Sequence, residues 1–236
     1  MENGKLYLVP TPIGNLKDIT LRALEVLKES DIIAAEDTRQ TLKLLNHFEI
    51  KKPLISYHKF NEQSKGNEII ELLLEGKNIA LVSDPGSVIV GKCINENIDF
   101  EVLPGATAIT TALVYSGLDT TKFLFRGFLP RENKDRRVIT DELLNSQETL
   151  IFYEAPHRLL DTLSYLMDVF GDRKIAVCRE LTKLYEEIFR GNLSDAIQHF
   201  VNNKPRGEFV LVLEGKKIED IKDKQNPLGW ISSLFS

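Results

Sequence analysis

Residues 79–90 read IALVSDPGSVIV. Four apolar residues stop at a turn of sequence SDPG, Ser83 to Gly86, and a second apolar run follows at once. A short apolar run bounded by turn residues is typical of a strand inside a parallel sheet, which is covered on both faces. The turn then lies at the carboxyl end of the strand, where open α/β sheets bind ligands. We therefore expect an α/β fold with a ligand site at strand ends.

The same alternation continues over the first half of the chain. Thr20 is a candidate cap for a helix with Leu21, Leu24 and Leu27 on its apolar face, and Thr38 for the following helix. Because strands that alternate with helices form parallel sheets, we expect one parallel sheet here. The expected strands are residues 5–9, 31–36, 53–57, 78–82 and 100–103, and the helices after Thr20 are 39–48, 62–74, 87–97 and 105–116.

The second half predicts another α/β unit. Residues 117–121, of sequence GLDTT, are the best candidate for a boundary. We therefore expect two α/β domains, residues 1–117 and 118–236, with the ligand cleft between them. The expected strands of the second unit are residues 123–128, 149–153, 175–179 and 209–213, and its helices are 135–145, 156–170 and 194–202.

Composition limits the class of protein. The chain has 236 residues, 42% of them hydrophobic and 28% charged, which is typical of a soluble globular protein. No apolar run approaches the roughly 18 residues of a membrane span, and the N-terminus lacks a signal-peptide pattern, so we expect a cytoplasmic protein. Cys93 and Cys178 lie far apart, and the four histidines lack metal-ligand spacing, so we expect buried thiols and no metal.

Charge gives a weaker indication about partners. The formal net charge of −5 argues against a protein that coats nucleic acid indiscriminately. The segment Arg131 to Arg137 nevertheless has four positive and two negative side chains. Such a segment can contact phosphates, although a solvated surface is the commoner explanation.

Six turns of a similar kind follow the expected strands. Each contains Gly, Pro or acidic residues, and glycine lets the backbone approach a ligand closely. The chain has no G-x-G-x-x-G after a strand, no P-loop and no G-x-S-x-G elbow, so dinucleotide, P-loop and serine hydrolase sites are not supported. The turns are residues 11–15, 36–39, 83–86, 104–107, 152–158 and 179–183.

These motifs resemble those of the ribosomal RNA small-subunit methyltransferase I family, a branch of the tetrapyrrole methylase superfamily. The resemblance runs from about Lys5 to Gly215 and includes TPIGN, EDTR, PGATAITTALVYSGL, GFLPR, FYEAPHRLLDTL, RELTKLYEEIFRG and RGEFVLVLEG. It implies two α/β domains of tetrapyrrole-methylase type, S-adenosylmethionine as methyl donor and a homodimer. It also implies 2′-O-methylation of a cytidine ribose in the decoding region of small-subunit (16S) rRNA.

The resemblance and the turn chemistry together suggest which residues form the donor site. Turns rich in glycine and proline suit the methionine and adenine parts of the donor, because these need backbone partners and close approach. The candidate donor-binding residues are Pro12, Gly14, Ser83, Asp84, Pro85, Gly86, Pro104, Gly105, Ala106 and Tyr153.

Polar side chains on the remaining turns are candidates for the acceptor side. Removal of the proton from a ribose hydroxyl would be assisted by a placed base, and Glu36, Glu154 or a Lys183 with a lowered pKa are the candidates. A helix-start ion pair with Arg158 is an equally good explanation for Glu154. The candidate RNA-binding residues are Arg39, Arg131, Lys134, Arg136, Arg137, His157 and Arg158.

One motif departs from the family pattern. Family members carry a longer segment, S-D-A-G-T-P-x-x-S-D-P-G, where this chain has only residues 83–86, and many continue beyond the position of Gly215. Two alternatives therefore stay open. One is a non-catalytic RNA-binding or dimeric relative with an impaired donor site, and the other is a methyltransferase that acts on a tetrapyrrole-like small molecule.

Overall fold

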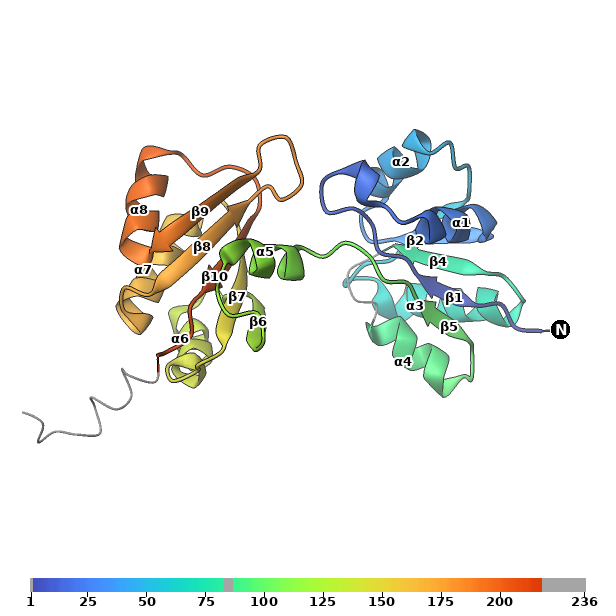
Figure 1. Ribbon diagram of the computed structural model, residues 1–236. Coiled ribbons are helices and arrows are strands. Elements are labelled where there is room, and N and C mark those ends of the chain that lie inside the picture. The colour runs from blue at the N-terminus through green and yellow to red at the C-terminus, as the bar shows by residue number, and fades with distance from the viewer. Residues whose placement is uncertain (1, 83–86, 218–236) are drawn as a thin grey trace, which may run out of the picture. The chain divides into compact units, whose positions relative to one another are not determined.

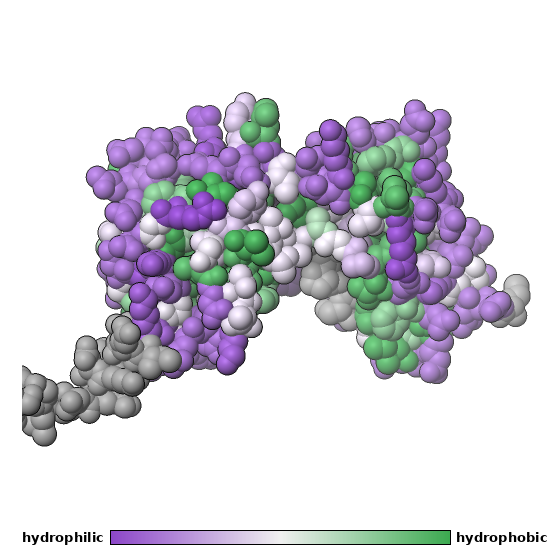
Figure 2. Space-filling model, viewed as in Figure 1, coloured by the Kyte–Doolittle hydropathy of each residue, from purple (hydrophilic) through white to green (hydrophobic). Residues whose placement is uncertain are grey.

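The structure is a computed structural model that describes residues 2–82 and 87–217. The chain divides into two compact units, Met1–Thr107 and Ala108–Ser236. Figure 1 shows that each unit contains a sheet with helices packed against it. On the face shown in Figure 2, both units carry hydrophilic and hydrophobic areas.

The first unit contains a five-stranded sheet with strand order β3-β2-β4-β1-β5. Every neighbouring pair is parallel, which confirms the expected parallel sheet. Its strands are β1 (Leu6–Leu8), β2 (Ile32–Ala35), β3 (Leu54–Ser56), β4 (Ile79–Val82) and β5 (Phe100–Val102). Its helices are the 3-10 helix η1 (Leu16–Asp18), α1 (Leu21–Glu29), α2 (Thr38–His47), α3 (Glu62–Leu74) and α4 (Ser87–Asn95).

Strand β4 shows why the first sheet needs a continuous apolar run. Ile79 and Leu81 pack on one face, in the core with α3 and α4. Ala80 and Val82 pack on the other face, in the core with α1 and α2. Because successive side chains of a strand point to opposite faces, burial on both sides requires every residue to be apolar.

The second unit contains a mixed sheet with strand order β6-β7-β10-β8-β9. β6 and β7 are parallel, and the other neighbouring pairs are antiparallel. Its strands are β6 (Phe123–Phe128), β7 (Thr149–Glu154), β8 (Lys174–Arg179), β9 (Glu187–Asn192) and β10 (Phe209–Leu213). Its helices are α5 (Ala108–Ser116), α6 (Asn133–Leu143), α7 (Leu159–Phe170) and α8 (Leu193–Asn202).

Helix α5 changes the division of the chain. It packs on β8 and β10 of the second sheet, with Ala112 and Leu113 buried. The structure therefore divides the chain after Thr107, earlier than the expected boundary at residue 117. Helices α6, α7 and α8 contribute to the large core on the opposite face of the second sheet.

Helix starts test the expected caps. Thr20 caps α1 as expected, because its side-chain oxygen accepts a hydrogen bond from Ala23 N at 3.0 Å. The cap of α2 is not Thr38 but Asp37, whose Oδ1 accepts from Arg39 N at 2.9 Å and from Gln40 N at 3.0 Å. An Asp carboxylate satisfies two backbone donors at once, and Thr38 is already helical.

Three of the expectations from composition concern described residues. Cys93 and Cys178 are both buried free thiols, as expected. Within residues 2–82 and 87–217, no helix has the length and apolar character to cross a membrane. In the same ranges, no cluster of three or more His, Cys, Asp or Glu side chains has an arrangement suited to a metal ion.

Candidate functional site

The carboxyl edge of the first sheet gathers the candidate ligand-binding turns of the first half. Because all five strands are parallel, the segments that follow them emerge at one edge. Val9 N donates to Leu81 O at 2.8 Å, and Leu103 N donates to Leu8 O at 3.0 Å, so the ladder continues up to the turns. The turns that the sequence indicated lie at this edge, within the described residues, at 10–15 after β1, 36–39 after β2 and 104–107 after β5.

Gly105 brings two of these turns into close contact. A Cβ atom at Gly105 would lie 2.4 Å from Cγ of Pro10, which is far inside van der Waals contact. β1 and β5 are neighbours in the sheet, and the turns after them approach so closely at Gly105 that a side chain there would overlap Pro10. The absence of a Cβ therefore has a structural reason, and it also leaves backbone open to a ligand.

The other donor candidates of the first unit lie on the same two turns. Pro12 and Ala106 are half-buried, and Gly14 and Pro104 are exposed. The turn between η1 and β1 is fixed at its end by Asn15, whose side chain accepts a hydrogen bond from Lys17 N at 3.1 Å. The remaining candidates, Ser83, Asp84, Pro85 and Gly86, lie outside the described residues.

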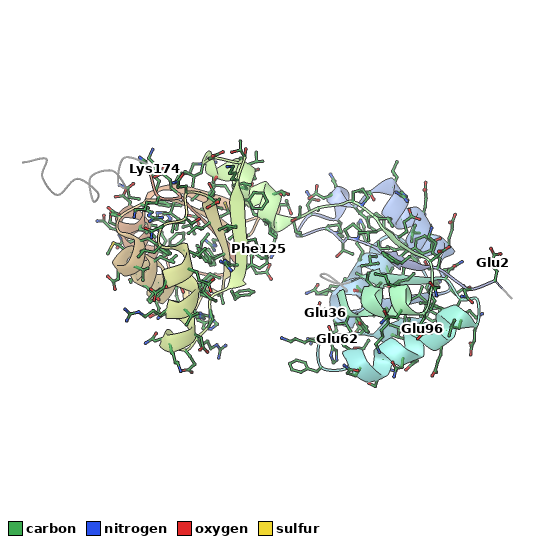
Figure 3. All side chains as sticks on the ribbon, turned by 90° about the horizontal axis from the view of Figure 1, so that it is seen from below. Glu2, Glu36, Glu62, Glu96, Phe125 and Lys174 are labelled. Carbon is green, nitrogen blue, oxygen red and sulfur yellow. The ribbon has the colours of Figure 1, made fainter. Side chains whose placement is uncertain are left out.

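The acidic turn after β2 contains two neighbouring carboxylates, Glu36 and Asp37, whose surroundings differ. Glu36, labelled in Figure 3, is exposed and follows β2 directly, and its N–H donates to Val82 O at 3.3 Å. Asp37 is engaged by the N-terminus of α2. Its hydrogen bond from Gln40 N, helped by Arg39 N and by the charges of Arg39 and Lys43, outweighs desolvation and lowers the pKa of the Asp37 carboxyl. Arg39 is exposed on the first turn of α2.

The end of β3 adds residues that the sequence did not indicate. Asn61 fixes this turn, because its Oδ1 accepts from His58 N at 2.8 Å and its Nδ2 donates to Ser56 O at 3.2 Å. His58 Nδ1 is buried and has no hydrogen-bond partner among the described residues. The turn contains no Gly or Pro, so turn chemistry could not indicate it, and only its position after a strand would have done so.

Glu154, at the end of β7, is enclosed by the second unit. Its side chain is 0% exposed. Oε2 accepts from the Thr162 hydroxyl at 2.5 Å, and Oε1 accepts from Ala155 N at 2.7 Å and lies 3.7 Å from Arg158 Nε. This geometry supports the ion-pair explanation for Glu154, because both of its oxygens interact with residues at or near the start of α7.

Arg158 also has structural partners. Its Nη2 donates to Leu129 O at 2.8 Å and to Pro130 O at 3.3 Å, so it ties the turn after β6 to the start of α7. Its side chain is 16% exposed, which leaves little of it for a phosphate. His157, in contrast, is exposed on the turn before α7.

Lys183 is paired with two carboxylates. Nζ donates to Glu180 Oε1 at 2.9 Å and to Glu208 Oε2 at 2.8 Å. Burial alone would lower the pKa of the Lys183 ammonium, but the hydrogen bonds and charges of Glu208 and Glu180 outweigh burial and raise the pKa. The expected lowered pKa is therefore wrong, and Lys183 is a poor base in this arrangement.

The basic segment 131–137 contains one cation that faces inward. Arg136 is 7% exposed; it donates to Asp161 Oδ2 and to Asn133 Oδ1, both at 2.7 Å, and lies 3.9 Å above the ring centre of Tyr165. This packing joins α6 to α7 and corrects the expected phosphate contact. The three other cations of the segment, Arg131, Lys134 and Arg137, are exposed.

Tyr153, the donor candidate of the second unit, belongs to an aromatic cluster. Its ring is half-buried and packs against Phe125 with ring centres 4.9 Å apart and against Phe128 at 5.6 Å. The structure thus gathers the described donor candidates of the first half at one sheet edge. It gives Glu154, Arg158, Lys183 and Arg136 partners within the second unit.

Comparison with known proteins gives the family. The family described as Tetrapyrrole (Corrin/Porphyrin) Methylases matches residues 5–197. A crystal structure of diphthine synthase has a TM-score of 0.73 at 15% identity, covering 94% of each chain. One of uroporphyrin-III-C-methyltransferase from Thermus thermophilus has a TM-score of 0.60 at 21% identity, covering 89% of this chain and 91% of the other. At such identities these structures show the fold alone.

Three curated relatives share the name Ribosomal RNA small subunit methyltransferase I. The Bacillus subtilis protein is 51% identical, with 94% of this chain and 79% of the relative covered. The Halalkalibacterium halodurans protein is 50% identical, with 92% and 79% covered. The Thermotoga maritima protein is 47% identical, with 91% of this chain and 100% of the relative covered. The chain therefore belongs to the tetrapyrrole methylase family, in the group of the ribosomal RNA small subunit methyltransferases I.

Proposed function

We propose that this protein transfers the methyl group of S-adenosylmethionine to the 2′-hydroxyl of a cytidine ribose in the decoding region of small-subunit (16S) rRNA. The observation that carries the proposal is identity of about half the residues with rRNA methyltransferases over more than nine-tenths of the chain. The arrangement of the first unit agrees with it, because turns suited to a donor lie at the carboxyl edge of the sheet.

The donor would be held at this edge of the first unit. When bound, it supplies a methyl group on a sulfonium, and much of the catalysis is then positioning of donor and acceptor. Pro12, Gly14, Pro104, Gly105 and Ala106 would hold it. The contact between Gly105 and Pro10 fits this role, because it fixes two glycine-containing turns against each other and leaves backbone groups accessible.

Glu36 is the base that we favour for the ribose hydroxyl. It is exposed at the same edge as the donor turns, whereas Glu154 is enclosed and Lys183 is held protonated by two carboxylates. A general base must reach the proton that it removes. Glu36 would accept this proton, and the exposed Arg39 on the next turn of chain would contact a nearby phosphate.

RNA binding would use the exposed cations of the second unit. Arg131, Lys134 and Arg137 are exposed, as is His157. Each phosphate contact adds salt dependence to binding but no sequence preference. The homodimer implied by the family resemblance stays a prediction, which light scattering on the purified chain will test.

Titration calorimetry with S-adenosylmethionine and with S-adenosylhomocysteine tests the donor site. We expect saturable binding of both ligands, and Gly105→Ala should weaken it, whereas Gly91→Ala on α4 should not. No binding to a folded chain would contradict the proposal. It would favour a non-catalytic RNA-binding relative, in agreement with the short turn at residues 83–86.

Methylation of ribosomal particles tests the acceptor. Small subunits that lack the modification are incubated with the protein and labelled donor, and the rRNA nucleosides are analysed by mass spectrometry. We expect 2′-O-methylcytidine with the unchanged chain and at least a hundredfold lower rate with Glu36→Gln, within the range for loss of a general base. Methylation of a uroporphyrinoid and not of rRNA would establish the small-molecule alternative instead.

A further inference from the structure

Strand β6 presents three phenylalanines on the surface of the second unit. Phe123, Phe125 and Phe128 are 40%, 39% and 57% exposed. Leu124, between the first two, packs against the large core of the unit, so its neighbours point to the other face of the sheet. Figure 3 labels Phe125 on this strand. An edge strand with three partly exposed aromatic rings needs an explanation, because edge strands usually carry charges or proline.

Two of these rings extend the aromatic surface to Tyr153 on β7. Phe125 and Phe128 both pack against the Tyr153 ring, and β6 is paired with β7 on its inner side. Gly127, with φ of 65°, lies where the register between the two strands shifts. This irregularity lets Phe128 join Phe125 beside the same tyrosine. We call Phe123, Phe125, Phe128 and Tyr153 the β6 aromatic surface.

The second unit leaves this surface largely uncovered by its own helices. Helices α6, α7 and α8 contribute to the core on the opposite face. Helix α5 lies on the same face as the aromatic rings, but its main packing is on β8, β9 and β10. The surface therefore lies over the part of the sheet formed by β6 and β7.

The stretch of sequence that contains β6 and the start of α6 is more basic than the chain as a whole. Residues 122–137 contain six basic and two acidic side chains, in a chain with a formal net charge of −5. Arg136 faces inward and Arg126 pairs with Glu142 at 3.2 Å. Lys122, Arg131 and Lys134 are exposed and form no ion pair within 4.0 Å among the described residues. Asp119 and Glu148 lie near Lys122: hydrogen bonds lower the pKa of both carboxyls, and the Lys122 charge adds to this lowering.

We propose that the β6 aromatic surface binds single-stranded RNA by stacking unpaired bases on its phenylalanine rings, while Lys122, Arg131 and Lys134 contact the phosphates. Aromatic rings interleaved with cations are the features that bind single-stranded nucleic acid, and proteins commonly recognise RNA at such unpaired bases. The basic character of the segment favours a polyanion over a second copy of this net-negative chain. The inference rests on the proposed function, because it assigns part of the rRNA contact.

Fluorescence anisotropy with a short fluorescein-labelled single-stranded RNA tests the inference. We expect the double variant Phe125→Leu/Phe128→Leu to bind about tenfold more weakly, with an unchanged slope of log Kd against log salt. The pair Phe125→Tyr/Phe128→Tyr keeps the rings and should bind as the unchanged chain does. Phe100→Leu, on an aromatic of similar exposure (36%) at the start of β5, should also leave binding unchanged. Circular dichroism and urea unfolding confirm that each variant is folded.

Charge variants separate stacking from phosphate contacts. Arg131→Gln/Lys134→Gln should weaken binding and reduce the salt slope by about two. Cross-linking of RNA that carries 5-iodouridine should modify a peptide that includes β6.

Unchanged RNA affinity of the leucine pair, in a chain that still methylates rRNA, would overturn the inference and leave the proposed function standing. Unchanged affinity with a loss of dimer in light scattering would overturn it in favour of a second copy. If RNA binding depends on the rings but no donor binds, the proposed activity fails while the stacking surface stands.

Discussion

The two halves of the chain use similar turn sequences differently. In the first unit, Glu36, Gly14 and Pro104 are exposed at the carboxyl edge of a parallel sheet. In the second unit, Glu154 and Arg158 have partners inside the unit itself. A turn that follows a strand therefore does not indicate by itself whether its polar side chains serve a ligand or the fold.

Glu154 and Arg158 find their partners in the segments that follow β6 and β7, whereas for Lys183 the difference has its origin in the sheets. A parallel sheet sends all its following turns to one edge, where no further element of the sheet caps them. In the mixed second sheet, β10 runs antiparallel between β7 and β8. The segment that leads into β10 therefore lies beside the ends of β7 and β8, and it supplies partners there. Glu208, just before β10, pairs with Lys183 in this way.

The strongest test of this contrast is Glu154→Ala. Removal of one partner from a buried, hydrogen-bonded ion pair should lower the free energy of unfolding by about 3–5 kcal/mol. Urea unfolding followed by circular dichroism measures the loss. Glu142→Ala is the matched control, because Glu142 is 58% exposed and pairs with Arg126 on the surface, where a pair contributes about 0–1 kcal/mol. A stable but inactive Glu154→Ala would instead give Glu154 a catalytic role.

Arg136 and Arg137 provide a comparison between sequence neighbours. Arg136→Ala removes two hydrogen bonds and a stacked cation from the α6–α7 contact and should cost about 2–3 kcal/mol. Arg137 is 78% exposed and lies 3.6 Å from Asp141, so Arg137→Ala should change stability by less than about 0.5 kcal/mol and weaken RNA binding at low salt. A loss of about 2–3 kcal/mol for Arg137→Ala as well would contradict this contrast between the two arginines.

Gly105→Ala tests the contact between turns in the first unit. The added methyl would lie 2.4 Å from Pro10 Cγ, so we expect a loss of about 1–3 kcal/mol from overpacking and weaker donor binding. Gly91→Ala is the control, since a Cβ there has nothing within 4 Å. Gly91 lies inside α4, so alanine should stabilise the chain by about 0.5–1 kcal/mol. Unchanged donor binding in Gly105→Ala would remove this turn from the donor site.

The sequence predicted the first unit well because its signals are local. Apolar runs such as residues 79–82 and turn residues such as Gly105 lie within a few positions of each other. Strand β9 was not predicted, because its residues are half-buried or exposed and it contains Gly191. The roles of Lys183 and Arg136 depend on Glu208 and Asp161, which lie 25 residues away from them. No local pattern could assign such partners.

The smallest expected effect concerns the start of α2, where the sequence indicated the wrong cap. Asp37→Ala should lower the melting temperature by roughly 2–4 °C, whereas Thr38→Ala should change it less, because Thr38 is already inside the helix. Hydrogen bonding to Gln40 N lowers the pKa of Asp37, so its contribution is complete above the ordinary Asp pKa of about 4 and is lost as pH falls through the lowered value. The difference between Asp37→Ala and the unchanged chain should therefore persist at pH 5 and shrink toward pH 2, as measured by thermal unfolding over this range. A larger loss of melting temperature for Thr38→Ala than for Asp37→Ala would show that Thr38 caps α2, as the sequence indicated.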